Sequence, residues 1–149
     1  MIRSEKRLRL CWAMIAALLT FIWGNSLMPG WISQTISDWL AGLLLGTKPV
    51  GGEMAAGSGT LRKLAHFTEF TALGVCLAWL HGMLGKGKFR PFLWGVLAAA
   101  TDETIQRFVP ERGPGIKDVC LDSAGVLTGI ILLWMGHDYL KKRSDMGLQ

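Results

Sequence analysis

Chemically active side chains recur at helical spacing in three apolar stretches of the sequence. Most of them are three or four positions from the next, so those within one stretch share one face of a helix. Carboxylates and an imidazole arranged in this way could transfer protons, and arginine or lysine side chains could hold an anion. Together with the loop residue Arg112, we name these residues the polar set: Arg62, Lys63, His66 and Glu69 in the first stretch, Asp102, Glu103 and Gln106 in the second, and Asp118 and Asp122 in the third.

The surroundings of the polar set indicate how it is used. An ionised group in hydrocarbon costs at least ~2.5–3.5 kcal/mol on insertion scales, so these side chains are expected to turn inward and share one pocket. We assign the catalytic candidates to His66, Glu69, Asp102 and Glu103. The predicted ligand-binding residues are Arg62, Lys63, Gln106, Arg112, Asp118 and Asp122. In the alternative interpretation, ion pairs among these residues merely hold three helices together near the lipid headgroups.

Arg112 lies in a loop, residues 110–115, that contains two prolines and two glycines. Such a loop is expected to be a rigid turn, and a guanidinium held there could make a bidentate contact with a phosphate or carboxylate. A salt bridge from Arg112 to Glu111 or Asp118 is the alternative. Similarly, the adjacent Asp102 and Glu103 could work as an acid and base, or could pair with Arg107 or Arg112.

A metal site is a further possibility for the first stretch. His66 and Glu69 offer two ligands three residues apart, and Asp102 or Asp118 could complete an oxygen-rich set. No cysteine joins the set, which argues against structural zinc. The sequence does not identify a metal or a cofactor.

The composition indicates the elements that must position these residues. Half of the 149 residues are hydrophobic, and only 18% are charged, against about 25% in an ordinary soluble chain. At about 20 residues per crossing, the chain can hold no more than about four membrane-spanning helices. We therefore predict a single all-α domain, residues 1–149, that forms an integral membrane four-helix bundle. The predicted spans are residues 8–28, 61–84, 89–108 and 116–140.

A fifth, shorter helix is predicted at residues 32–45, between the first and second spans. Its apolar residues recur on one face, which is typical of an amphipathic helix lying in the membrane interface. They are Ile32, Ile36, Trp39, Leu40, Leu43 and Leu44. In the last span, Gly125-x-x-x-Gly129 predicts close packing against a neighbouring helix.

The distribution of charge predicts the orientation. Of the 16 Lys and Arg residues, ten flank the ends of the spans on the side of both termini, and the other six share the opposite side with eight of the 11 acidic residues. By the positive-inside rule, both termini are cytoplasmic and the polar set faces outward. Because the basic residues encode orientation, no nucleic-acid partner is expected.

The order and spacing of the polar set resemble a known family. The matching segments are Arg62-Lys63-x-x-His66-Phe67-x-Glu69-Phe70 with Gly74, then Asp102-Glu103-x-x-Gln106-Arg107-Phe108-Val109-Pro110-x-Arg112, then Asp118-Val119-x-x-Asp122-x-x-Gly125. They resemble the VanZ-like family of small bacterial membrane proteins, and with the four-span layout the likeness covers nearly the whole chain. Phe70 stands where the family commonly has tyrosine, and Asp122 where it commonly has asparagine.

The resemblance implies a multi-pass protein of the bacterial cytoplasmic membrane with a link to resistance against teicoplanin, a lipid-tailed glycopeptide. Together with the outward polar set, it leads us to expect a pocket for an anionic lipid headgroup or envelope ligand. Membrane lipids, a lipid-linked phosphate or a lipoglycopeptide are the expected partners. One alternative is a membrane-embedded hydrolase or transferase with His66 or Glu103 as base and a divalent metal; another is a structural or partner-binding bundle. The oligomeric state is not indicated.

Overall fold

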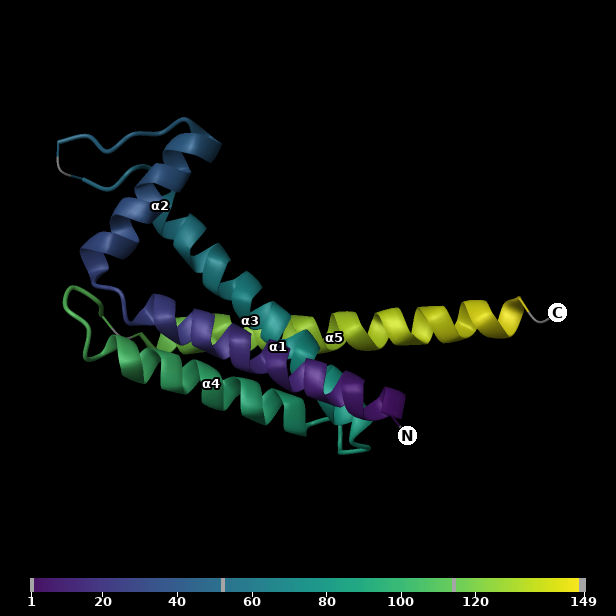
Figure 1. The fold of residues 1–149 in the computed structure, drawn as a ribbon. Coiled ribbons are helices and arrows are strands. Elements are labelled where there is room, and N and C mark those ends of the chain that lie inside the picture. The colour runs from purple at the N-terminus through teal and green to yellow at the C-terminus, as the bar shows by residue number, and fades with distance from the viewer. Residues whose placement is uncertain (1, 52, 114, 148–149) are drawn as a thin grey trace.

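The computed structural model describes residues 2–51, 53–113 and 115–147. Over these residues the chain forms five helices and no strand, which confirms the all-α prediction (Figure 1). The helices are α1 (Ile2–Ser26), α2 (Gly30–Leu45), α3 (Ser58–Met83), α4 (Arg90–Gln106) and α5 (Ile116–Met146). Pro114, part of the predicted rigid turn, lies outside the described residues.

The helices correspond to the five predicted segments, but their ends differ. α1 begins at Ile2 and α5 continues to Met146, because the charged residues flanking each apolar run also favour helix. Two stretches are long and apolar enough to cross a membrane, Glu5–Ser26 in α1 and Ile116–Met146 in α5. α4 has only 17 residues, and α3 carries four members of the polar set in its first half. A four-span bundle therefore remains a proposal.

α3 is the central helix and makes its most extensive contacts with α5. Glycines permit this close approach. A Cβ atom added to Gly74 would lie 2.2 Å from the carbonyl oxygen of Val126, and one added to Gly129 would lie 2.0 Å from that of Thr71. A Cβ at Gly125 would come within 2.6 Å of the Phe67 carbonyl oxygen. The predicted close packing at Gly125 and Gly129 is thus confirmed.

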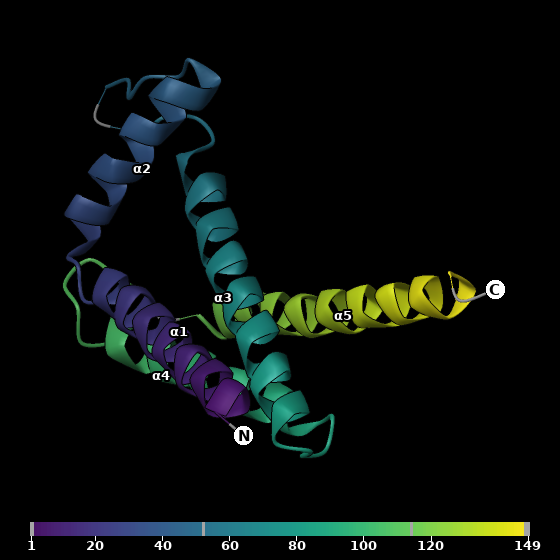
Figure 2. The same ribbon diagram turned by 45° about the vertical axis from the view of Figure 1, so that its right-hand side comes forward.

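The apolar core lies where α1, α3, α4 and α5 meet. α1 and α4 run side by side, α3 crosses them, and the C-terminal part of α5 extends beyond the other helices (Figures 1 and 2). The largest fully buried apolar side chains of the core are Ile22, Phe70, Leu73, Leu80, Val126 and Ile130. Both chain ends and the turn between α3 and α4 lie at one end of this core, and the loop between α4 and α5 lies at the other (Figure 1).

α2 lies beside the start of α3 and leaves its apolar face open. Trp39 is 67% exposed and Ile36 51% exposed, whereas Ser37 and Ala41 are buried. The Gln34 amide donates hydrogen bonds to Asp38 (2.8 Å) and to the Ser58 hydroxyl (3.1 Å), which ties the helix to α3. The structure thus contains the predicted amphipathic helix, and its place in the membrane interface is a proposal.

Candidate functional site

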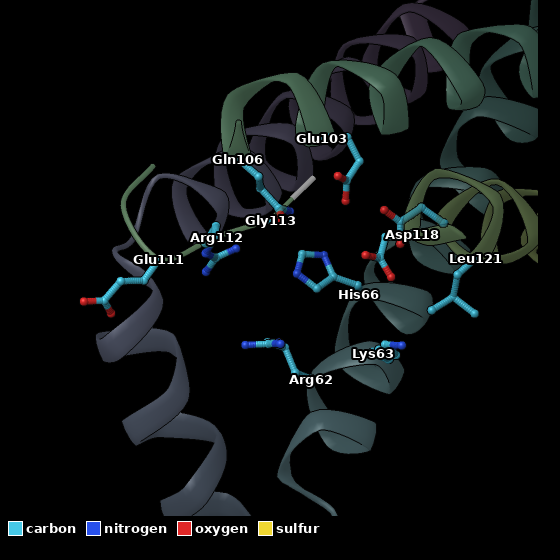
Figure 3. Close-up of a pocket in the computed structure, with 11 residues that line it drawn as sticks. Arg62, Lys63, His66, Glu103, Gln106, Glu111, Arg112, Gly113, Asp118 and Leu121 are labelled. Carbon is cyan, nitrogen blue, oxygen red and sulfur yellow. The ribbon is translucent and has the colours of Figure 1, made fainter. Parts of the chain in front are cut away.

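A cavity of about 100 Å³, the first cavity, lies at the end of the core opposite the chain termini. Eight of the ten members of the polar set line it, and they come from α3, α4, α5 and the loop between α4 and α5 (Figure 3). These are Arg62, Lys63, His66, Glu103, Gln106, Arg112, Asp118 and Asp122. The expected convergence of three helices on one polar pocket is therefore present. Glu111 also reaches the lining, but it is exposed and its carboxylate points away (Figure 3).

The other two members of the polar set, Asp102 and Glu69, lie close to the first cavity but do not line it. Asp102 is fully buried, and its Oδ2 accepts a hydrogen bond of 2.8 Å from the Gln106 amide. Glu69 lines a neighbouring space, the second cavity, of about 130 Å³. The Glu69 Oε1 accepts a hydrogen bond from the side chain of Asn25 at 3.4 Å.

The second cavity is bounded by α2 and the first half of α3, and much of its lining is apolar. The apolar residues are Met28, Ile36, Leu40, Leu61 and Ala65. Arg62, His66 and Arg112 line both cavities. These three side chains therefore form the shared wall between a polar space and a largely apolar one.

Hydrogen bonds to three helices fix the loop that carries Arg112. Its Nη2 donates to the carbonyl oxygen of Asn25 at the end of α1 (3.0 Å), and the Gly30 amide of α2 donates to the Pro110 carbonyl (3.0 Å). The Gly115 amide donates to Glu103 Oε2 (2.9 Å). Arg112 is thus held in place, as the loop composition predicts, and the carboxylate of Glu103 is engaged in holding the start of α5.

The ion pairs of the alternative interpretations are not found among the described residues. No arginine or lysine nitrogen there lies within 4.0 Å of a carboxylate oxygen; in the site, only His66 Nδ1 and Glu69 Oε2 reach that distance. Arg112 is partly buried, and burial, followed by the positive charge of Arg62, lowers its pKa. An arginine nevertheless stays protonated in proteins. The site therefore holds cationic groups that no carboxylate pairs at salt-bridge distance.

Several buried polar atoms of the site have no hydrogen-bond partner. They are His66 Nδ1, Glu69 Oε2, Asp102 Oδ1, Arg112 Nε and Asp122 Oδ1. Buried polar atoms are nearly always hydrogen-bonded, so such a group of exceptions indicates a place for a ligand. Ligand atoms of His66, Asp102 and Asp122 lie within 4.8 Å of one another. This group differs from the metal set expected from spacing, because Asp122 takes the place of Glu69 and Asp118.

Two residues of α1 belong to the site but are absent from the predicted set. Asn25 contacts Glu69 and Arg112, and the Ser26 hydroxyl accepts a hydrogen bond of 3.1 Å from Gln106. Both are polar residues at the end of an apolar helix, and this position is the sequence feature that could have indicated their place in the site. Their roles depend on α1 packing against α4, which spacing within one segment cannot reveal.

Comparison with known families places the chain. A family model described as VanZ/LLP1 matches residues 10–137, which include the whole polar set. The chain belongs to the VanZ/LLP1 family. Membership confirms the resemblance and, with the two apolar helices α1 and α5, identifies a VanZ-like membrane protein. No curated protein and no solved structure matches the chain.

Proposed function

We propose that this VanZ-like protein binds the anionic headgroup of a membrane amphiphile, with a phosphate in the first cavity. The observation that carries the proposal is the arrangement of Arg62 and Arg112. Both line the two cavities, and neither has a carboxylate oxygen within 4.0 Å. Figure 3 shows both guanidinium groups directed toward the space beside His66.

Two neighbouring guanidinium groups repel each other unless an anion lies between them. Arg62 is close enough to Arg112 to lower its pKa. Arg112 also keeps a buried Nε–H without an acceptor, whereas its Nη2 is fixed by Asn25. Planar guanidinium groups match the geometry of phosphate oxygens bidentately, and such charge-assisted hydrogen bonds are about twice as strong as neutral ones. A phosphate therefore satisfies both the charge and the free donors.

The second cavity favours an amphiphile over a free phosphate. It shares Arg62, His66 and Arg112 with the first cavity and is otherwise largely apolar. A headgroup held by the two arginines would have its first methylene groups against Leu40 and Leu61. The rest of the acyl or prenyl chain would then continue into the bilayer beside α2. Phospholipids and lipid-linked phosphates both have this chemistry.

The proposed orientation is a four-span protein of the bacterial cytoplasmic membrane with both termini inside and the cavities open to the outer leaflet. Two observations support it. Both termini and the turn between α3 and α4, which carry ten of the 16 basic residues, lie at one end of the bundle (Figure 1). The cavities lie at the other end. The positive-inside rule then assigns the site to the outer face.

Native mass spectrometry of the protein purified in mild detergent tests this function. We expect a phospholipid or polyprenyl phosphate to remain bound to the wild type. The double variant Arg62→Gln/Arg112→Gln should lower its occupancy about tenfold or more, because each lost charged hydrogen bond is worth about 1.5–3 kcal/mol. Arg107→Gln is the matched control, since Arg107 is exposed in the same loop and lines neither cavity.

Two results would contradict the proposal. One is a wild type that carries no amphiphile and takes up none from vesicles containing anionic lipid. The other is equal loss of lipid in the Arg107→Gln control. The teicoplanin link is tested separately, by expressing the wild type and the double variant in a susceptible strain. We expect only the wild type to raise the inhibitory concentration of teicoplanin.

A further inference from the structure

We propose that His66, Asp102 and Asp122 bind one divalent metal ion, of the Mn²⁺ or Zn²⁺ type, at the junction of α3, α4 and α5. Each residue can offer one ligand atom, and these atoms lie within 4.8 Å of one another. Asp102 is 0% exposed and Asp122 2% exposed. No two of the three residues share a helix, so the fold itself assembles the group.

The two buried carboxylates, those of Asp102 and Asp122, give an independent observation in favour of a metal. Oδ1 of Asp102 and Oδ1 of Asp122 are both buried and accept no hydrogen bond. No arginine or lysine of the described chain lies within 4.0 Å of either carboxylate. Burying a carboxylate without a donor or a cation is costly, and buried charges are normally paired or coordinate a metal. The imidazole of His66, whose Nδ1 is also buried without a hydrogen-bond partner, completes the group.

The charges around the cavities favour a divalent cation. Four carboxylates of the polar set line the two cavities, and that of Asp102 lies close behind them. Arg62, Lys63 and Arg112 are the cations that line the cavities, and Glu111 is not counted because its carboxylate points away (Figure 3). With His66 neutral, this leaves a formal excess of two negative charges. One divalent ion balances this excess. The carboxylates are Glu69, Asp102, Glu103, Asp118 and Asp122.

The ligand types narrow the choice of metal. Carboxylates suit Mn²⁺ and Mg²⁺, whereas an imidazole suits Zn²⁺ and other transition metals, so one imidazole with two carboxylates fits Mn²⁺ or Zn²⁺. In a tetrahedral site with bonds of about 2.1 Å, any two ligand atoms lie about 3.4 Å apart. The ligand atoms of His66, Asp102 and Asp122 now lie within 4.8 Å of one another, so the side chains would close on the ion by roughly an ångström or more when it binds.

Neighbouring groups hold the proposed ligands in position. The Gln106 amide donates to Asp102 Oδ2 and also contacts Ser26, which leaves Oδ1 free for the metal. This is the arrangement by which hydrogen bonds to the second oxygen orient a ligating carboxylate. Asp122 and His66 line the first cavity, so the open coordination positions would face it. The metal site does not depend on the proposed amphiphile.

Titration of the full-length, chelator-treated protein in detergent with Mn²⁺, followed by electron paramagnetic resonance of the free ion, tests this site. We expect one Mn²⁺ per chain, displaced by Zn²⁺. Asp102→Asn and Asp122→Asn should each weaken binding at least tenfold. The control is the exposed pair His137 and Asp138, whose His137→Ala and Asp138→Asn variants should bind like the wild type.

If the aspartate variants fail to fold, the site can still be tested on a protein that keeps all three proposed ligand residues. Electron spin echo modulation of Mn²⁺ bound to the His137→Ala protein should contain a ¹⁴N coupling from His66. The proposal is overturned if no Mn²⁺ or Zn²⁺ binds to the wild type, or if the bound ion has no nitrogen coupling. It is equally overturned if binding is lost in the control variants, or if folded Asp102→Asn and Asp122→Asn proteins bind as the wild type does.

Discussion

At the scale of single residues, the carboxylates of the site have different tasks. Glu103 accepts a hydrogen bond from the Gly115 amide, so one of its oxygens holds the start of α5. Asp102 and Asp122 each keep an unpartnered oxygen. Although the sequence made Glu103 a candidate base, its contact favours a positioning role, and the chemistry available to a ligand is concentrated on the two aspartates.

Replacement of Glu103 should therefore affect stability. A hydrogen bond to a charged acceptor is worth about 1.5–3 kcal/mol, and this one is partly buried, so Glu103→Ala should lower the apparent melting temperature in detergent by several degrees. Glu103→Gln keeps a side-chain oxygen that can accept the bond and should lose much less. Glu53→Ala, in an exposed loop, is the control. An Ala variant as stable as the wild type would show that this hydrogen bond does not hold the loop.

The convergence of the polar set follows from elementary physical chemistry, which is why the sequence alone predicts it. Ionised groups on one face of an apolar helix must turn toward each other or toward water. In contrast, the sequence does not predict which cation contacts which partner. Arg112 could have reached Asp118 on sequence grounds, but its loop is bound to Asn25 and Gly30 instead. Those partners belong to α1 and α2, far away in the sequence.

At the scale of the elements, the crossing of α3 and α5 positions the site. Gly125 lies against the Phe67 carbonyl, so Asp122, three residues earlier on α5, comes beside His66 on α3. The sequence predicts close packing from the glycine spacing. It does not predict which helix is the partner, because the spacing describes only one of the two surfaces.

Substituting a contact glycine should separate these helices. Gly129→Ala places a Cβ atom 2.0 Å from the Thr71 carbonyl oxygen, and overpacking of this kind costs about 1–3 kcal/mol. We expect a lower melting temperature and, because α3 and α5 carry different ligands, weaker Mn²⁺ binding. Gly136→Ala is the matched control on the same helix, since nothing lies within 4 Å of its added Cβ. It should be neutral or slightly stabilising; a similar loss in both variants would contradict the packing argument.

At the scale of the whole molecule, the orientation in the membrane decides which ligands can reach the site. The positions of the five helices follow from the apolar runs and from the glycines and prolines between them. The number of membrane crossings does not follow in this way. α3 and α4 carry polar residues of the polar set, and this leaves each of them too short an apolar stretch to span a bilayer on composition alone. Only α1 and α5 are long and apolar enough to span a bilayer on composition.

Labelling of single cysteines tests the proposed orientation. Cys120 is exposed and is first replaced by serine, whereas Cys11 and Cys76 are buried. Glu53→Cys, in the loop between α2 and α3, should react with a membrane-impermeant maleimide on intact cells. Lys86→Cys, in the turn between α3 and α4, should react only after permeabilisation. Both positions are exposed in the fold. The reverse pattern would place the cavities on the cytoplasmic side and exclude ligands of the outer leaflet.

The shortness of α4 has a consequence for the surrounding lipid. Its 17 residues span about 26 Å at 1.5 Å per residue, whereas the hydrocarbon region is about 30 Å thick. If α4 crosses the bilayer, this mismatch thins the adjoining leaflets, and tilting of the helix only increases the deficit. Phosphates of neighbouring lipids are then drawn down toward the buried end of the helix, so an amphiphile could slide in sideways from the leaflet without leaving it.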